Sequence, residues 1–263
     1  MIKADLQIHS KYSSHALYMP YKNIMKKLKS KYPESSFFEG KVWWMEYLGI
    51  DGSSDPEKIL EIARMKGLKA IAITDHNTFL GSIEAQRLSK KYNIVVIPAE
   101  EVSTTEGEIL AYGITEKIPF RITPQEAIKK IHSQGGLAAI SHPFLKPHPK
   151  KDFAAISEHL ILDLDIDAVE VFSPIKGFQK YWSDFALKNN LAELGGSDAH
   201  MDSLIGSVWT EFPDECKTTN DFLEAIKARK TKAGGIEKRK LLLLRAGFEY
   251  LWKNTFGRPF IKY

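Results

Sequence analysis

The feature that most constrains the fold of this chain is the alternation of short apolar runs with segments of helical periodicity. Strands that alternate with helices are typical of βαβ units and of a parallel sheet. About seven or eight such units predict a closed or nearly closed (β/α) barrel, with a doubly wound open sheet as the alternative. The predicted strands are Ala4–His9, Ala70–Thr74, Ile94–Ser103, Ile109–Ile114, Leu137–His142, Ala168–Phe172, Leu191–Ser197 and Ser207–Phe212.

Helix signals lie between the predicted strands. Asp55 precedes Pro56, which suits an N-cap followed by the first helical position, and Gly67 then ends the helix. Thr123 and Pro124 start another helix in the same way. The predicted helices are Pro56–Lys66, Gly81–Tyr92, Thr123–Gln134 and Thr219–Arg229.

Two segments interrupt the alternation. Residues 16–51 are rich in aromatic side chains and far exceed the usual connection of about 2–6 residues, so we interpret them as an insertion after the first strand. The insertion is expected to form a lid or substrate wall, or a helical hairpin with its own small core. The C-terminal extension, residues 236–256, carries apolar side chains at helical spacing and predicts a helix across the barrel.

Length and composition favour one domain in the cytoplasm. The chain has 263 residues, of which 43% are hydrophobic and 27% charged, as in an ordinary globular protein. We expect residues 1–263 to form a single barrel domain. Cys216, the one cysteine, allows no internal disulfide, and no run reaches the ~20 apolar residues that cross a bilayer. No signal peptide is predicted, and the net charge of +4 allows anionic substrates without requiring nucleic acid.

Histidines and carboxylates gather where the predicted strands end. Along the first strand, period-two alternation predicts that Asp5, Gln7 and His9 share one face, while Leu6 and Ile8 share the other. Carboxylates in one cavity would repel each other. Bound divalent cations are the simplest means of neutralising this repulsion and of coordinating the imidazoles as well. Mixed nitrogen and oxygen donors predict zinc, manganese or iron. The further polar residues expected at this end of the sheet are Asp75, His76, Glu100, Glu101, Glu108, His142, Asp198 and His200.

Five short motifs occur in a fixed order along the chain. They are Asp-x-Gln-x-His-Ser, Ile-Thr-Asp-His-Asn-Thr, Ile-Pro-Ala-Glu-Glu-Val-Ser-Thr, Ser-His-Pro and Gly-Ser-Asp-Ala-His. In this order they resemble the motifs of the PHP (polymerase and histidinol phosphatase) family, over about residues 3–212 without the insertion. The resemblance implies an α/β fold, specifically a distorted (β/α)7 barrel with two or three divalent metal ions at its C-terminal face. It also implies an enzyme that hydrolyses phosphoesters.

The resemblance implies which residues bind the metal ions. His9, Glu101 and Asp198 would hold one ion, and Glu101 would bridge to a second ion that His142 holds. The full set of implied ligands is Gln7, His9, His15, His76, Glu101, Glu108, His142, Asp198 and His200.

A third ion and an outer layer of carboxylates follow from the same resemblance. His76 and His200 would hold the third ion, together with His15. Asp5 and Asp75 would orient the ligands from outside, as such carboxylates often do.

Two positions depart from the family pattern. Gln7 and Glu108 stand where the family usually has histidine. A glutamine offers only a neutral amide oxygen, and Glu108 replaces an imidazole by a carboxylate. Both changes shift the donor set toward oxygen, which favours manganese or magnesium.

The expected reaction is hydrolysis of a phosphomonoester by a hydroxide that bridges the metal ions. His76 or His200 would protonate the leaving group, and Asp198 completes the catalytic set. The expected substrate is a nucleotide, a short oligonucleotide or another small phosphorylated metabolite, since the aromatic insertion could stack a base. Lys146 and Lys176 are candidate phosphate contacts, with solvated loops as the alternative.

Two other functions stay open. The departures at Gln7 and Glu108 allow a catalytically weakened, metal-binding module. Family modules attached to polymerases allow a part in nucleic-acid processing, although the dispersed basic residues give no reason to expect a stable nucleic-acid partner. No membrane partner is expected.

Overall fold

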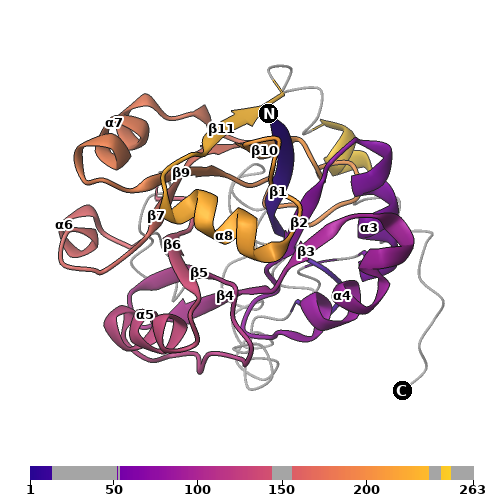
Figure 1. Cartoon of the computed structure of the whole chain (residues 1–263). Helices are drawn as coiled ribbons and strands as arrows, with labels where there is room; N and C mark the ends of the chain where they lie inside the picture. The colour runs from indigo at the N-terminus through magenta and orange to yellow at the C-terminus, as the bar shows by residue number, and fades with distance from the viewer. Residues whose placement is uncertain (14–51, 53, 144–155, 237–243, 250–263) are drawn as a thin grey trace, which may run out of the picture.

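The computed structural model describes residues 1–13, 52, 54–143, 156–236 and 244–249. Their strands form two mixed sheets with helices on the outside (Figure 1). The first sheet has, in order, β11 (Lys232–Gly235), β10 (Val208–Phe212), β1 (Ile2–Ile8), β2 (Ala70–Ile73) and β3 (Val95–Ile97). The second has β4 (Ala99–Thr104), β5 (Gly107–Tyr112), β6 (Leu137–Ile140), β7 (Ala168–Ser173) and β8 (Gly177–Phe178), and β9 (Ala192–Gly195) also pairs with β7.

Strand pairing is parallel within β1–β2–β3 and within β6–β7–β9, but antiparallel elsewhere. The mixed α/β class is therefore confirmed. The (β/α)7 barrel is not, because the hydrogen-bonded ladders of the described residues form two sheets rather than one closed ring. The predicted strand Ile94–Ser103 is in fact β3 and β4, split at Pro98, which has no N–H to donate to a ladder. Isolated bridges, Ile8 with Ala199 and His76 with Glu101, join the two sheets.

The helices are α3 (Pro56–Met65), α4 (Leu80–Tyr92), α5 (Pro124–Ser133), α6 (Glu158–Ile161), α7 (Lys180–Lys188) and α8 (Thr219–Lys227). Thr123 caps α5 as predicted, since its hydroxyl accepts the Glu126 N–H and the Glu126 side chain accepts the Thr123 N–H. Asp55 is the N-cap residue of α3 but makes no side-chain cap bond; its carboxylate pairs with Lys11 instead.

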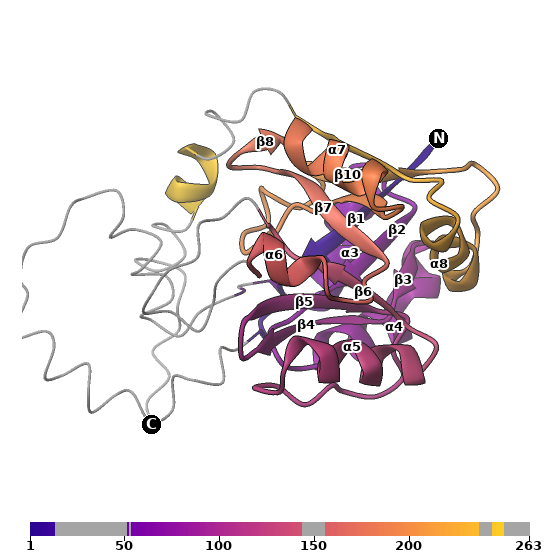
Figure 2. The same cartoon turned by 90° about the vertical axis from the view of Figure 1, so that its left-hand side faces the viewer.

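The buried side chains of both sheets meet in an interior cluster. Leu6, Leu110, Tyr112 and Leu194 belong to it, and α8 adds Phe222. Helices α5, α6 and α7 pack against the second sheet from outside, and α3 and α4 pack against the first. Helix α8 lies at the end of the fold where β1 begins (Figure 2), so the residues that follow β1 lie at the opposite end.

The alternation predicted along β1 is broken in the middle of the strand. Its pairing with β2 shifts register between Asp5 and Ile8. Leu6 consequently packs in the interior cluster, whereas Ile8 packs under α3 and α4. The prediction that Leu6 and Ile8 share a face is therefore wrong, because a bulge changes which residues face inward.

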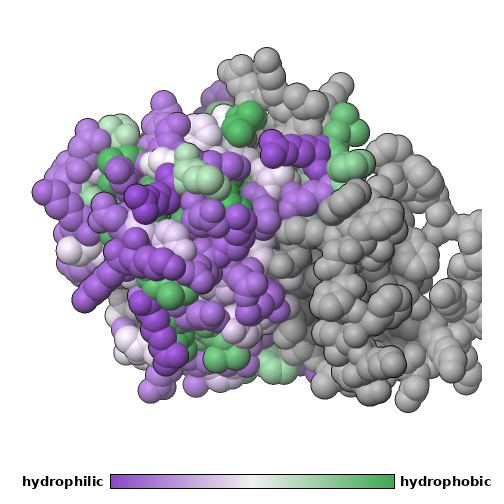
Figure 3. All heavy atoms as spheres, turned by 90° about the vertical axis from the view of Figure 1, so that its right-hand side faces the viewer, coloured by the Kyte–Doolittle hydropathy of each residue, from purple (hydrophilic) through white to green (hydrophobic). Residues whose placement is uncertain are grey.

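The insertion at residues 16–51 lies outside the described residues, as does most of the predicted C-terminal helix, of which residues 244–249 are helical. On the face drawn in Figure 3, the described surface is mostly hydrophilic, with apolar side chains singly or in small groups. None of the helices in the described part of the chain has the length and apolar character needed to cross a lipid bilayer.

Candidate metal centre

Glu101, on β4, lies at the centre of a cluster of histidines from three other strand ends. Its Oε2 lies 3.2 Å from Nε2 of His9 and 3.7 Å from Nδ1 of His76, and its Oε1 lies 3.4 Å from Nε2 of His142. The carboxylate is fully buried. One acid therefore contacts imidazoles that follow β1, β2 and β6.

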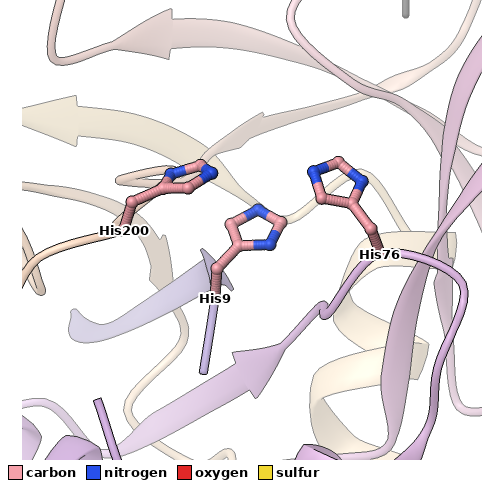
Figure 4. Close-up of side chains that lie close together, drawn as sticks. All are labelled: His9, His76 and His200. Atoms are coloured by element: carbon pink, nitrogen blue, oxygen red, sulfur yellow. The ribbon is translucent and has the colours of Figure 1, made fainter. Parts of the chain in front are cut away.

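Asp198 and His200, which follow β9, complete one side of this cluster. Oδ1 of Asp198 lies 3.1 Å from Nε2 of His9. The ring of His9 stacks between two other imidazoles, with centroids 4.3 Å from His200 and 4.6 Å from His76 (Figure 4). Asp198 has a positive φ of 49°, which turns the chain sharply after β9.

Glu108 lies on the other side of the cluster. Because β5 runs antiparallel to β4, with Ser103 opposite Glu108, the start of β5 reaches the end where β4 finishes. Oε1 of Glu108 lies 3.1 Å from Nδ1 of His76, and its Oε2 lies 3.5 Å from Nε2 of His142. Glu108 is buried and belongs to the same cluster as Glu101.

These donors fit divalent metal ions. Three groups have donor atoms that all lie within 4.8 Å of one another. The two of these groups that contain carboxylates have only Glu101 in common. A carboxylate has two oxygens and can therefore contribute to two neighbouring ions. Imidazole and carboxylate donors in this mixture suit zinc, manganese or iron. The three groups are His9–His76–His200, His9–Glu101–Asp198 and His76–Glu101–Glu108.

Gln7 lies beside Glu101, but it is the amide nitrogen that faces the acid. Nε2 of Gln7 lies 3.3 Å from each oxygen of Glu101 and donates to the Ser141 hydroxyl at 3.0 Å. Ser141 in turn donates to Oε1 of Glu101 at 2.7 Å. Oε1 of Gln7, the atom expected to bind metal, has no hydrogen bond to any described residue.

The cluster is self-paired, in that its carboxylates and imidazoles form ion pairs and shift each other's pKa values. Burial alone would raise the pKa of Glu101, but His76, His142 and His9 hold it well below its ordinary value. Burial likewise opposes ionisation of Asp198, yet His200 and His9 lower its pKa to about 2. For His142, burial favours the neutral ring, but Glu101 raises its pKa to about 10. The positive charge of His142 thus balances part of the negative charge that metal ions would otherwise balance.

Asp5 and Asp75 bind neighbouring backbone groups. Asp5 accepts the Ser197 N–H at 2.9 Å and hydroxyl at 2.6 Å, and the Gly206 N–H at 2.6 Å. Burial raises the pKa of Asp5 to about 6 despite these bonds. Asp75 accepts the N–H and hydroxyl of Ser10, the residue after His9. Each acid thus fixes a residue next to one of the cluster's donors.

Of the remaining predicted site residues, two have no described position and one lies apart from the cluster. His15 and Lys146 lie outside the described residues. Lys176 is exposed on the turn between β7 and β8, where its N–H donates to the Ser173 hydroxyl.

Sequence reasoning missed one buried acid, Glu170 on β7. Its Oε2 accepts the backbone N–H of His142 at 2.9 Å. Burial raises the pKa of Glu170 to about 8, although the nearby His142 lowers it. The available signal was a lone carboxylate in the otherwise apolar predicted strand Ala168–Phe172.

Comparisons with known proteins agree with this architecture. A model of the PHP-associated family matches residues 183–231. The uncharacterized protein MJ1587 of Methanocaldococcus jannaschii is 38% identical over 172 residues, which are 65% of this chain and 82% of that protein.

Two solved structures share the fold. A two-domain protein from Bacteroides vulgatus that contains a PHP-like metal-dependent phosphoesterase superposes with a TM-score of 0.66 and 19% identity, over 94% of this chain and 69% of that one. The lesion-specific endonuclease PfuEndoQ from Pyrococcus furiosus superposes with a TM-score of 0.54 and 16% identity, over 88% of this chain and 57% of that one.

Fold and site together define an α/β protein with a histidine–carboxylate cluster at the ends of its strands. The ordered motifs and the family match identify it: the chain belongs to the PHP family. Among its relatives is MJ1587.

Proposed function

We propose that this protein is a metal-dependent phosphoesterase that hydrolyses a phosphomonoester of a nucleotide, short oligonucleotide or other small metabolite. The observation that carries the proposal is the buried Glu101, whose Oε2 contacts both His9 and His76 and whose Oε1 contacts His142, and which two donor groups share. That arrangement suits a carboxylate shared by two cations, and two-metal sites are a common solution for phosphoryl hydrolysis.

Two or three divalent ions would be held by this cluster. His9 and Asp198 would bind one ion together with Glu101, while His76, His142 and Glu108 would bind another that Glu101 shares. A further ion would engage His200. When bound, such cations supply Lewis acidity and lower the pKa of a coordinated water toward neutrality.

The charge of the cluster with three ions bound favours a phosphate dianion. Glu101, Glu108 and Asp198 contribute about −3 and the attacking hydroxide about −1, so two divalent ions leave the site near zero, while three ions leave it with about +2. A centre of three ions therefore attracts a phosphate group to the same place as the donors. Preorganised positive charge also stabilises the oxygens on which charge accumulates during transfer.

His200 is better placed than His76 to protonate the leaving group. Its side chain is 23% exposed, against 6% for His76, so it lies nearer to an incoming substrate. Nδ1 of His200 lies 2.9 Å from the Asp198 carbonyl oxygen, which can only accept, so Nδ1 carries a proton. In a centre of two ions, the proton that the imidazolium gives to a leaving oxygen would then come from Nε2, whereas a third ion on His200 would occupy that nitrogen.

The test is elemental analysis of the purified protein together with a manganese-supplemented phosphatase assay on nucleoside monophosphates, short oligonucleotides and p-nitrophenyl phosphate. We expect at least two ions per chain and turnover that chelation abolishes. Glu101→Gln should lower activity by more than the roughly 10–100-fold typical of outer-shell partners. Glu106→Gln, in the exposed β4–β5 turn, is the matched control. Less than one ion per chain and no turnover would overturn the proposal.

A second candidate is a catalytically weakened metal-binding module. The contact that favours it is the Gln7 amide, which donates to Ser141 and faces both oxygens of Glu101. Phosphatase activity that is absent from the native chain and appears in Gln7→His would support this alternative. The fold shared with a lesion-specific endonuclease suggests that such a module would act in nucleic-acid processing. Binding of abasic-site DNA that depends steeply on salt concentration would support this role.

A further inference from the structure

Glu170 is a buried acid for which the proposed reaction has no use. It lies on β7, and its side chain is nearly inaccessible to solvent. Its neighbours Val169 and Val171 pack outward, in the cluster under α5, α6 and α7. Because successive residues of a strand face opposite sides, Glu170 faces the inside of the fold. A carboxylate there requires polar partners.

One of those partners is the backbone of a proposed metal ligand. Oε2 of Glu170 accepts the N–H of His142 at 2.9 Å. His142 has a positive φ of 31°, an unfavourable conformation for a residue with a side chain. Pro143 follows it and restricts its backbone further. The hydrogen bond that the His142 N–H donates to Glu170 therefore stabilises a turn at His142 that the local sequence does not favour.

The turn determines where the His142 ring points. With the peptide in this conformation, Nε2 lies 3.4 Å from Glu101 and 3.5 Å from Glu108. A relaxed backbone at His142 would move the ring with respect to both acids. Catalytic and metal-binding groups need supporting contacts of this kind to keep their geometry.

Space for the Glu170 carboxyl group is left by a glycine. A Cβ atom on Gly196 would lie 2.7 Å from Oε1 of Glu170 and 2.5 Å from Cβ of Gln7. Gly196 begins the turn that carries Asp198, which also has a positive φ. Glu170 consequently lies between two turns of the cluster, the turn at His142 and the turn from Gly196 to Asp198.

We propose that Glu170 is a positioning residue of the metal centre, which acts through the backbone N–H of His142 to aim that imidazole at the ion between Glu101 and Glu108. The inference rests on the proposed metal site, but not on hydrolysis. Glu170 contacts neither substrate nor ion in this role. What it requires is an acceptor oxygen, not a negative charge.

The test compares Glu170→Gln, which keeps an acceptor oxygen, with Glu170→Leu, which has a similar size and none. Manganese binding is measured by calorimetry and by electron paramagnetic resonance, on chelator-treated full-length protein. We expect Glu170→Gln to bind within about threefold of the native affinity. Glu170→Leu should lose about 10–100-fold for one ion, the range typical of outer-shell partners. The matched control is Glu193→Leu on the neighbouring β9, whose carboxylate bonds Ser183.

A double-mutant cycle with His142→Ala separates positioning from general loosening of the fold. If Glu170 acts through His142, then Glu170→Leu adds little to the loss already caused by His142→Ala. Additive losses, native affinity in Glu170→Leu, or equal losses in the Gln and Leu variants would each overturn the proposal. Should Glu170→Leu fail to fold, Glu170→Asp, which shortens the reach to the N–H by one methylene, replaces it in the cycle. Native protein that binds manganese without hydrolysing any phosphoester would refute the proposed activity and leave this inference standing.

Discussion

Nδ1 of His76 lies 3.1 Å from Oε1 of Glu108, and this contact joins the end of β2 to the start of β5 across the histidine–carboxylate cluster. The pair belongs to a donor group that also includes Glu101. Two of its three members are carboxylates, so this part of the centre is rich in oxygen. Harder ions such as manganese prefer such a donor set, while added imidazole favours zinc.

Glu108→His should therefore change the metal preference of the centre. We expect the ratio of zinc to manganese affinity to rise by about tenfold or more, equivalent to at least ~1.4 kcal/mol. Competition titrations with both ions, followed by elemental analysis, measure this ratio. Glu106→His places the same imidazole in the exposed β4–β5 turn and should leave the ratio unchanged. An unchanged ratio in Glu108→His would show that Glu108 is not a ligand.

Removal of metal should destabilise the protein in a pH-dependent way. Ions at 100 times their dissociation constant add about 2.7 kcal/mol to the free energy of unfolding, so manganese should raise the Tm of chelated protein. Because Glu101 raises the pKa of His142 to about 10, protons compete with metal ions for this cluster. Apparent metal affinity should thus fall as the pH falls from 8 to 6. Calorimetry in buffers of different ionisation enthalpy would show proton release on binding, and its absence would contradict the self-paired cluster.

Gly196→Ala should destabilise the fold because the new methyl group has no room. The added Cβ would lie 2.5 Å from Cβ of Gln7 and 2.7 Å from Oε1 of Glu170, both of which are buried. Overpacking of this kind costs about 1–3 kcal/mol. Gly247→Ala is the matched control, because it lies in helical residues 244–249 and its Cβ meets nothing within 4 Å. Chemical denaturation of both variants gives the comparison, and equal stabilities would contradict the prediction.

Glu100 should make the stability of the metal-free protein depend on pH. Burial raises its pKa from 4.5 to about 7, although the Ile118 N–H and Lys117 oppose the shift. A raised folded-state pKa means that this contribution is complete below pH 4.5 and is lost as the pH rises to about 7. At about 1.4 kcal/mol per pKa unit, its upper limit is roughly 3 kcal/mol.

Glu100→Gln removes this titration and keeps an oxygen that can accept from Ile118. Its Tm relative to the native chain should therefore increase between pH 5 and pH 8, with both proteins in chelator. Glu116→Gln, an exposed acid, should show no such trend. A difference in Tm that stays constant with pH would place the ionisation of Glu100 outside this range.

The position of the cluster follows from the sequence because strand ends meet at one edge. His9, His76 and His142 each come within three residues of the end of a strand, and the structure brings all three to Glu101. The hydrophobic periodicity of the sequence is enough to find the strand ends. The carboxyl ends of parallel strands lie at one edge of a sheet, so the residues there are expected to lie close together. The main helices were predictable for a similar reason, with Thr123 and Pro124 marking the start of α5.

Other features depend on contacts between distant segments, which local patterns do not contain. The bulge in β1 places Leu6 and Ile8 in different clusters, and it arises from pairing with β2. The role of Glu170 depends on the turn at His142, 28 residues away. The antiparallel hairpin of β4 with β5 likewise departs from a strict strand–helix alternation, which predicts parallel neighbours.

The sequence separation of His9 and His200 has a consequence for protein synthesis. Their ring centroids lie 4.3 Å apart in the folded chain, yet 190 of the 263 residues separate them in the sequence. At ~5–20 residues per second, roughly 10–40 s pass on the ribosome before the second ring follows the first. The complete donor set is therefore assembled late in the synthesis of each molecule, after most of both sheets has been translated, and no ion that needs all of its donors can bind before then.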